Sequence, residues 1–252
     1  MCAQLSHIFL DIAGLVIDFG TRYPEYVRGR CTEYLASADH VGEAGADVLH
    51  LQASEPDIAR ANAAQVGLME AELYAMTIPL GEACPALGRL MMHGVAVECD
   101  GRAFIFTAAS GVGKSTHAFL WQKYLGADRV RVINGDKPIL RFRDDGEILA
   151  CGSPWSGKEH LDANVQVPLR GICLLRRLDG TPEDRPSIVK ASREEALDFM
   201  MHQIFIPGSV AGQMATFRLL ERLYDRVPFY HLATDMSREG VLVSTGCLLA
   251  EE

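Results

Sequence analysis

The chain has 252 residues, of which 48% are apolar and 23% are charged, and its 33 acidic and 24 basic side chains give a formal net charge of −9. This composition is typical of a folded globular protein and excludes a disordered or fibrous one. The Lys and Arg residues are scattered along an acidic chain, so we do not expect nucleic acid as a partner.

Cysteine usage and hydropathy give expectations about the compartment. The cysteines show no C-x-x-C spacing and no neighbouring histidine cluster, so neither a disulfide framework nor a zinc site is indicated. They are Cys2, Cys31, Cys84, Cys99, Cys151, Cys173 and Cys247. The N-terminal apolar stretch is interrupted by Asp11 and Asp18. No later run approaches the roughly 20 apolar residues of a membrane span, so we expect a cytoplasmic protein without a membrane partner.

In chain order, the first elements are short and varied. His7–Phe19 predicts a strand, or a hairpin that turns near Ala13–Gly14. Apolar spacing then predicts further elements as follows: a helix at Glu25–Leu35, a strand at Asp47–Gln52, weak helical periodicity over Asp57–Ile78 and a helix at Glu82–Met92.

The pattern changes after His93. Two apolar runs, Gly94–Cys99 and Ala103–Thr107, flank an Asp-Gly pair, which is a strong hairpin signal. The remaining predictions are a helix ending near Leu125, a strand at Val130–Asn134, a hairpin at Ile139–Cys151 turning at Asp144–Gly146, a strand at Gly171–Arg176, helices at Ser192–Ile204 and Val210–Val227, a strand at Phe229–Ala233 and a helix near Arg238–Leu249 with Asp235 or Ser237 as its cap. We divide the chain into a smaller N-terminal α+β part, residues 1–85, and a core with C-terminal helices, residues 86–252.

The run G-x-G-K-S between a predicted strand and a predicted helix indicates a phosphate-binding loop. Glycines let successive backbone amides point at phosphate oxygens, Lys114 would reach the β- and γ-phosphates, and the Ser115 hydroxyl would bind Mg²⁺. The usual motif begins with glycine where this chain has Ala108. The alternative is a glycine-rich turn. The expected nucleotide-binding residues are Ser110, Gly111, Val112, Gly113, Lys114, Ser115 and Thr116.

Two further residues fit the chemistry of phosphoryl transfer. Asp136 ends the strand after the loop and could bind metal or take a proton from an attacking hydroxyl, although a turn aspartate in G-D-K-P is the alternative. His93 precedes the hairpin and would lie near the loop, where its imidazole could orient Asp136 or contact phosphate. Taken alone, a single histidine is more often a structural residue, which is the alternative.

The loop Gly152–His160 places a Trp between small residues, followed by Lys, Glu and His. Such a loop can hold an aromatic ring and a cation beside a ligand, which makes Trp155, Ser156 and Lys158 candidate contacts for an acceptor. The alternative is a Pro/Gly turn with the ring packed on the core. Arg176 would steady the transferring phosphoryl group, unless it is simply a surface residue.

These motifs together resemble the HPr kinase/phosphorylase group and its relatives, whose nucleotide-binding core is like that of phosphoenolpyruvate carboxykinase. The resemblance rests on Met92–Val97, Thr107–Thr116 and Ile133–Pro138, and on the G-x-P-W-x-G-K stretch Gly152–Lys158 of a short HPr-kinase-like subgroup. It implies an α/β fold with a P-loop core of this kind and a smaller N-terminal part. It also implies that Asp136 acts as acid/base and that His93 assists it.

The chain departs from that family at two positions. Gly135 stands where the first of two aspartates is expected, and Thr116 stands where the family has a glutamate for metal. The C-terminal glycine-rich signature that binds HPr is absent from the sequence, so HPr itself is not the expected substrate.

The resemblance implies an ATP- and Mg²⁺-dependent kinase that transfers the γ-phosphoryl group to a hydroxyl, either on a serine of a peptide or protein or on a small alcohol. Two alternatives stay open: a nucleotide-binding regulatory module without turnover, and a carboxykinase-type enzyme acting on a small organic acid. Association with further copies of the chain stays open as well.

Overall fold

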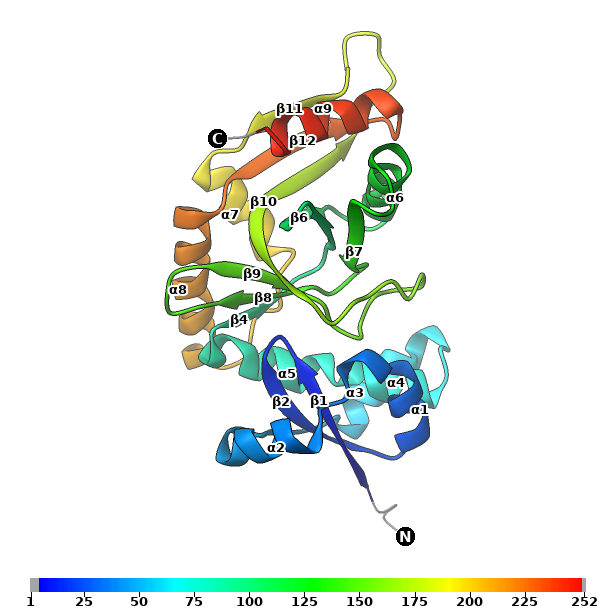
Figure 1. Cartoon of the computed structure of the whole chain (residues 1–252), viewed down its shortest axis with the longest axis vertical. Coiled ribbons are helices and arrows are strands. Elements are labelled where there is room, and N and C mark those ends of the chain that lie inside the picture. Colours follow the sequence, from blue (N-terminus) through cyan, green and yellow to red (C-terminus); the bar gives the residue numbers. More distant parts are fainter. Residues whose placement is uncertain (1–4, 251–252) are drawn as a thin grey trace.

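The computed structural model describes residues 5–250 and shows an elongated mixed α/β protein (Figure 1). A small sheet with α1–α5 occupies the N-terminal end, and a larger sheet with α6–α9 occupies the rest. Among the described residues, no helix combines the length and the apolar character needed to cross a membrane.

The small sheet is built on the predicted hairpin. Strand β1 (Ser6–Ile12) pairs antiparallel with β2 (Leu15–Thr21), and β3 (Leu49–Gln52) lies parallel to β2. Ala13 and Gly14 turn the chain with φ of 53° and 69°, the left-handed geometry of a tight hairpin turn. The helices of this part are α1 (Pro24–Arg30), α2 (Ala38–Ala44), α3 (Glu55–Ala61), α4 (Leu68–Ala75) and α5 (Thr77–Ala83).

The predicted helix Glu82–Met92 is wrong. Helix α5 ends at Ala83, a 3₁₀ turn covers Cys84–Leu87, and β4 (Arg89–Met91) follows. Pro85 cannot donate a helical hydrogen bond, and Gly88 adopts φ of 71°, which stops the helix. Leu90 and Met91 therefore lie in a strand that pairs with Ile139–Phe142.

The larger sheet runs in the order β4-β8-β9-β10-β6-β5-β7, with β12 beside β10 and β11 beside β12. Its strands are β5 (Val95–Cys99), β6 (Arg102–Thr107), β7 (Val130–Asn134), β8 (Ile139–Phe142), β9 (Ile148–Cys151), β10 (Gln166–Arg177), β11 (Ser187–Lys190) and β12 (Phe229–Thr234). These strands were predicted except β11, an edge strand whose Val189 is 58% exposed, while β4 of the same sheet was predicted as helix. The two predicted hairpins are confirmed.

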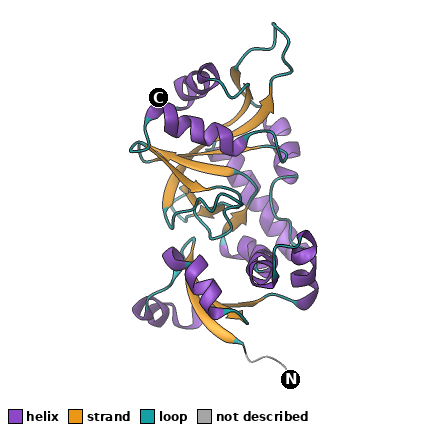
Figure 2. Cartoon of the chain, turned by 90° about the vertical axis from the view of Figure 1, so that its right-hand side faces the viewer, coloured by secondary structure: helices purple, strands orange, loops and turns teal. Residues whose placement is uncertain are grey.

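The helices of the larger part cover this sheet (Figure 2). They are α6 (Lys114–Leu125), α7 (Arg193–Met201), α8 (Val210–Arg226) and α9 (Arg238–Leu248). Of the two proposed caps for the last helix, Ser237 is the one whose side chain accepts from the Gly240 amide.

The core does not stop at the expected boundary after residue 85. The cluster that includes Ile8, Phe19 and Leu80 also contains Ile139 and Trp155 from the larger part. The two-part division therefore stays a prediction. The described cysteines are free thiols, and Cys2 lies outside the described residues.

A buried polar triangle joins α6 to α9. Trp121 Nε1 donates to His117 Nε2 at 3.2 Å and to Ser244 Oγ at 3.0 Å, and all three residues are 0% exposed. His117 Nε2 also lies 3.1 Å from Ser244 Oγ, whereas the buried Nδ1 has no hydrogen-bond partner among the described residues. Burial lowers the pKa of His117 to about 4, because the interior disfavours the imidazolium.

This burial predicts a pH-dependent stability. Below the ordinary pKa of 6.5 the unfolded chain binds a proton that folded His117 refuses until about pH 4, so acidification through this window lowers the free energy of unfolding. The contribution of this residue is about 3 kcal/mol. Denaturant titrations of wild type and His117→Gln across the window should show a shallower pH slope in the variant.

The exposed His202 supplies the matched control. His202→Gln should keep the wild-type slope, and an unchanged slope in His117→Gln would contradict the assignment of a buried neutral imidazole.

Candidate active site

The loop between β6 and α6 has the backbone that phosphate binding requires. Gly111 and Gly113 adopt φ of 79° and 117°, a region that favours glycine. Helix α6 begins directly afterwards at Lys114, so its free N-terminal amides face the loop. Ala108, at the usual first glycine, has no positive φ and is 1% exposed within the core. That position therefore does not require glycine.

The side chain of Lys114 lies back along this loop. Its Nζ donates to the carbonyl of Ala108 at 2.9 Å and to that of Ala109 at 3.3 Å, and the residue is only 8% exposed. Burial lowers the pKa of Lys114, with Asp136 opposing the effect and Lys137 adding to it. The lysine and the aspartate thus share one electrostatic environment.

Asp136 is placed by a turn that Asn134 organises. Asn134 Oδ1 accepts from the amides of Asp136 at 2.8 Å and Lys137 at 2.6 Å. Its Nδ2 donates to the carbonyl of Ser153 at 2.8 Å, and the residue is 0% exposed. An Asn at the end of a strand followed by Gly is the signal of such an Asx turn, although our sequence reasoning passed over Asn134.

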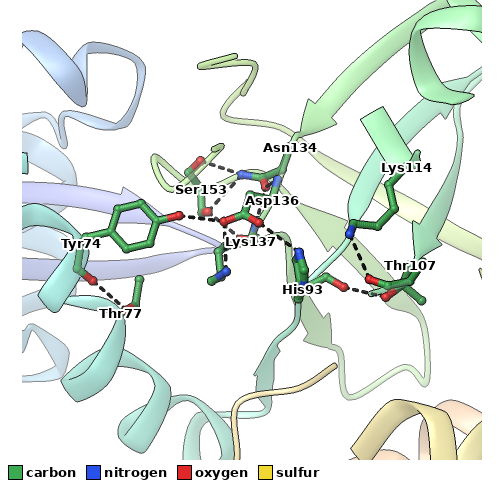
Figure 3. Close-up of polar contacts among 10 residues, drawn as sticks. Tyr74, Thr77, His93, Thr107, Lys114, Asn134, Asp136, Lys137 and Ser153 are labelled. Atoms are coloured by element: carbon green, nitrogen blue, oxygen red, sulfur yellow. Dashed lines mark hydrogen bonds and ion pairs between the residues drawn. The ribbon is translucent and has the colours of Figure 1, made fainter. Parts of the chain in front are cut away.

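Three donors surround the Asp136 carboxylate (Figure 3). Tyr74 donates its hydroxyl to Oδ2 at 2.8 Å, and Lys137 Nζ lies 3.0 Å from the same oxygen. His93 Nε2 lies 3.3 Å from Oδ1. The structure thus brings together the two predicted residues His93 and Asp136, and adds Tyr74 from α4. Figure 3 shows Tyr74 and Lys114 on opposite sides of the carboxylate.

The backbone of His93 is held on both sides. Its amide donates to the carbonyl of Gln203 at 2.6 Å, and its carbonyl accepts from Thr107 Oγ1 at 2.7 Å. Burial lowers the pKa of His93, the charges of Lys114 and Lys137 lower it further, and Asp136 opposes them. The neutral imidazole is therefore favoured near neutral pH.

Gly135 is required by a close backbone approach. A Cβ atom at this position would lie 2.6 Å from the carbonyl oxygen of Ser156. An aspartate, the residue of the family pattern, would therefore displace the loop that carries Ser156. A close contact within this chain therefore explains why it has glycine where the family pattern has aspartate.

Two of the predicted acceptor contacts are buried, and the structure shows the alternative of a Trp155 ring packed on the core. Trp155 is 3% exposed, and its Nε1 donates to the carbonyl of Leu73 at 2.7 Å. Ser156 is 0% exposed and is bonded to Asp162 and, at 3.1 Å, to Arg30. The Trp155 ring is buried because it packs against the apolar cluster on one side of the loop and not on the solvent side.

Lys158 differs, since its exposed side chain lines an open groove of about 550 Å³. The groove is bounded by Tyr26, Ala61, Ala64, Val66, Glu70, Tyr74, Gly157, Lys158 and His160. It therefore runs up to the tyrosine that holds Asp136.

Arg176 makes no contact with the Lys114–Asp136 group among the described residues. Its guanidinium forms two hydrogen bonds with Asp184, of 2.7 and 2.6 Å, and its side chain is 57% exposed. Arg176 follows Leu174 on β10. Leu174 pairs in register with Thr107, the last residue of β6 before the loop starts.

Oxygen atoms of the kind that bind Mg²⁺ lie near the loop, although the described residues hold no cluster of three or more His, Cys, Asp or Glu side chains that could hold a metal ion. Ser115 and Glu159 line the same small hollow, and Thr116 is exposed. A Cβ atom placed on Gly157 would lie 3.7 Å from Glu159 Oε2 and 3.3 Å from Asp136 Cβ, so both side chains lie close to this glycine. Hydroxyl and carboxylate oxygens are the ligands that Mg²⁺ prefers, and it usually keeps several waters. Sequence reasoning missed Glu159 because it is 44 residues beyond Ser115, in a different segment.

Comparison with known proteins gives little. No protein-family model matches the chain, and no curated protein matches it. Among solved structures, the chain is similar to the Hpr(Ser) kinase/phosphatase from Coxiella burnetii, at 11% identity and a TM-score of 0.33, over 62% of this chain and 91% of that one.

The steric role of Gly135 gives a prediction. Gly135→Ala should lower the free energy of unfolding by about 1–3 kcal/mol, because the new methyl group pushes on the Ser156 carbonyl. Chemical denaturation measures the change. Gly29→Ala is the control, since a Cβ there meets nothing within 4 Å. Equal stability of wild type and Gly135→Ala would show that the loop has room at this point.

Proposed function

We propose that the protein is an ATP-dependent kinase that transfers the γ-phosphoryl group to a hydroxyl. The observation that carries this proposal is the convergence of a buried lysine in a glycine loop with a carboxylate and a neutral histidine. Lys114 is 8% exposed, and its charge acts on both His93 and Asp136. This reaction needs at least one group that binds phosphate and one that accepts the proton of the acceptor hydroxyl.

The roles follow from the contacts. The amides of the Ser110–Thr116 loop hold phosphate oxygens, and Lys114 exchanges the carbonyls of Ala108 and Ala109 for phosphate. Asp136 accepts the proton of the acceptor hydroxyl, oriented by His93 and Tyr74. Ser115 and Glu159 are the oxygen donors that would hold Mg²⁺, which when bound neutralises phosphate charge.

The groove beside Tyr74 is the proposed acceptor side. It opens next to Asp136 and presents the Lys158 ammonium and the Glu70 carboxylate over an otherwise largely apolar surface. A peptide with a serine or an alcohol with an apolar body fits such a surface. Of the acceptor contacts expected from sequence, only Lys158 keeps that role in the proposal, because Trp155 and Ser156 are buried and Arg176 is paired with Asp184.

A regulatory nucleotide-binding module without turnover is the second candidate. The close approach of Gly135 to Ser156 favours it, because the segment can present only one aspartate where the resembling enzymes use two. The two candidates share the loop and differ in the role of Asp136.

Lys114→Ala should weaken ATP binding by about tenfold or more, because the variant loses a charge-assisted hydrogen bond to phosphate. Calorimetric titration of Mg·ATP measures this change. Lys123→Ala, on the exposed face of the same helix, is the matched control. Equal affinities of wild type and Lys114→Ala would refute the loop assignment.

Asp136→Asn should leave Mg·ATP affinity within about threefold of wild type and lower the transfer rate by about 10²-fold or more, since an amide cannot accept the proton. Phosphoryl transfer from labelled ATP to a panel of serine peptides and alcohols measures the rate. Asp144→Asn, in the exposed β8–β9 turn, is the control. A normal rate in Asp136→Asn would remove Asp136 as the base. No transfer by wild type to any acceptor would favour the regulatory candidate.

A further inference from the structure

Met236 has an unusual backbone conformation beside the phosphate-binding loop. It lies in the turn between β12 and α9, and its φ of 65° is in the left-handed region. Glycine and asparagine are the residues that adopt this region most readily, and other side chains adopt it at an energetic cost. Such conformations gather at functional sites, where the surrounding structure holds them in place. The turn thus carries a methionine where the backbone alone would favour glycine or asparagine.

The Met236 side chain lies across the glycine loop. A Cβ atom placed on Gly113 would lie 2.3 Å from Met236 Cε, 3.1 Å from Sδ and 3.8 Å from Cγ. Gly113 directly precedes Lys114, the first residue of α6. The thioether end of the methionine therefore contacts the loop one residue before the lysine proposed to bind phosphate. Met236 is half-buried, so part of its surface stays open to a ligand.

The turn that carries Met236 is held in place from both ends. The Met236 amide donates to Oγ1 of Thr234, the buried last residue of β12, at 3.4 Å. On the other side, the Ser237 side chain caps the first turn of α9. Helix α9 is joined to α6 by the buried hydrogen bond from Trp121 to Ser244. The methionine and the loop are thus fixed relative to each other by the two helices that follow them.

The order of the strands places Met236 and Asp136 on opposite sides of the loop. The loop follows β6, while β5 separates β6 from β7 and β10 separates β6 from β12. Strands β10 and β12 run parallel to β6, and β7 runs in the same direction because both β7 and β6 are antiparallel to β5. The ends of β7, β6 and β12 therefore lie at one edge of the sheet, with Asp136 following β7 and Met236 following β12 (Figure 1).

We propose that Met236 contacts the nucleoside of the bound nucleotide. This inference rests on the proposed function, in which the γ-phosphate faces Asp136. The nucleoside is attached to the opposite end of the phosphate chain, so it leaves the loop on the side of Met236. A methionine side chain is flexible and polarizable, and its sulfur makes favourable contacts with aromatic rings such as a nucleotide base. Met236 is then a residue that favours a nucleotide over an inorganic polyphosphate.

Mg·ATP and magnesium tripolyphosphate, which lacks the nucleoside, are the probes, each titrated calorimetrically into the whole chain. Met236→Asn removes the thioether and introduces a residue that tolerates the left-handed backbone. We expect ATP affinity to weaken by about three- to tenfold and tripolyphosphate affinity to stay within about twofold of wild type. Met214→Asn, which removes the same side chain from the exposed face of α8, is the control and should leave both affinities unchanged.

Equal ATP affinities of wild type and Met236→Asn overturn the inference and leave the proposed function intact. Parallel weakening of both ligands also overturns it, because the side chain then supports the loop and not the nucleoside. If wild type binds neither ligand, the proposed function fails and the inference fails with it. Should Met236→Asn fail to fold by circular dichroism, Met236→Gly, which also permits a φ of 65°, gives the same comparison.

Discussion

The position of the Asp136 carboxylate depends on contacts from distant parts of the chain, and the candidate site depends on that position. Asn134 fixes the turn below it, His93 and Lys137 contact it from the larger part, and Tyr74 reaches it from α4. One carboxylate thereby connects the helices of the N-terminal part to the phosphate-loop region. In the proposed mechanism Asp136 is the general base, which must be held in a fixed geometry to act on a bound hydroxyl, and these contacts hold it in place.

The same arrangement explains why the loop Gly152–His160 is structural at one end and exposed at the other. Trp155 packs into the core and bonds to Leu73, one residue before Tyr74. The ring thus supports the helix that holds Asp136, and it acts on the site through that helix. Beyond Gly157 the loop is exposed, and there Lys158 and Glu159 border the groove and the hollow beside Ser115.

Much of the fold follows from local sequence signals. The turns at Ala13–Gly14 and Asp100–Gly101 and the strand–loop–helix passage around Lys114 were all predictable, because each depends on residues that are neighbours in the chain. The helix expected over Glu82–Met92 failed because apolar spacing alone does not distinguish a helix from a 3₁₀ turn followed by a strand, and Pro85 decided between them. Strand β11 was missed because it is short, exposed and at a sheet edge.

The site was also predictable only in part, because some of its contacts join residues that are far apart in the sequence. His93 precedes the predicted hairpin, and Asp136 follows the strand after the predicted loop. Because the hairpin and the loop bring these positions together, the contact between the two residues could be expected. Tyr74 lies 62 residues from Asp136 in sequence, and nothing local marks it as a partner. The burial of Trp155 depends on which face of a loop the core covers, which is a property of tertiary packing and not of the loop's composition.

In the proposed function, nucleotide phosphates bind between Lys114 and Asp136. A structure of the protein with Mg²⁺ and a non-hydrolysable ATP analogue tests this placement. We predict β- and γ-phosphates on the amides of Ser110–Thr116, Lys114 Nζ moved from the carbonyls of Ala108 and Ala109 to phosphate, and the γ-phosphate facing Asp136. A nucleotide bound elsewhere, or a γ-phosphate directed away from Asp136 with Lys114 still on those carbonyls, would contradict it.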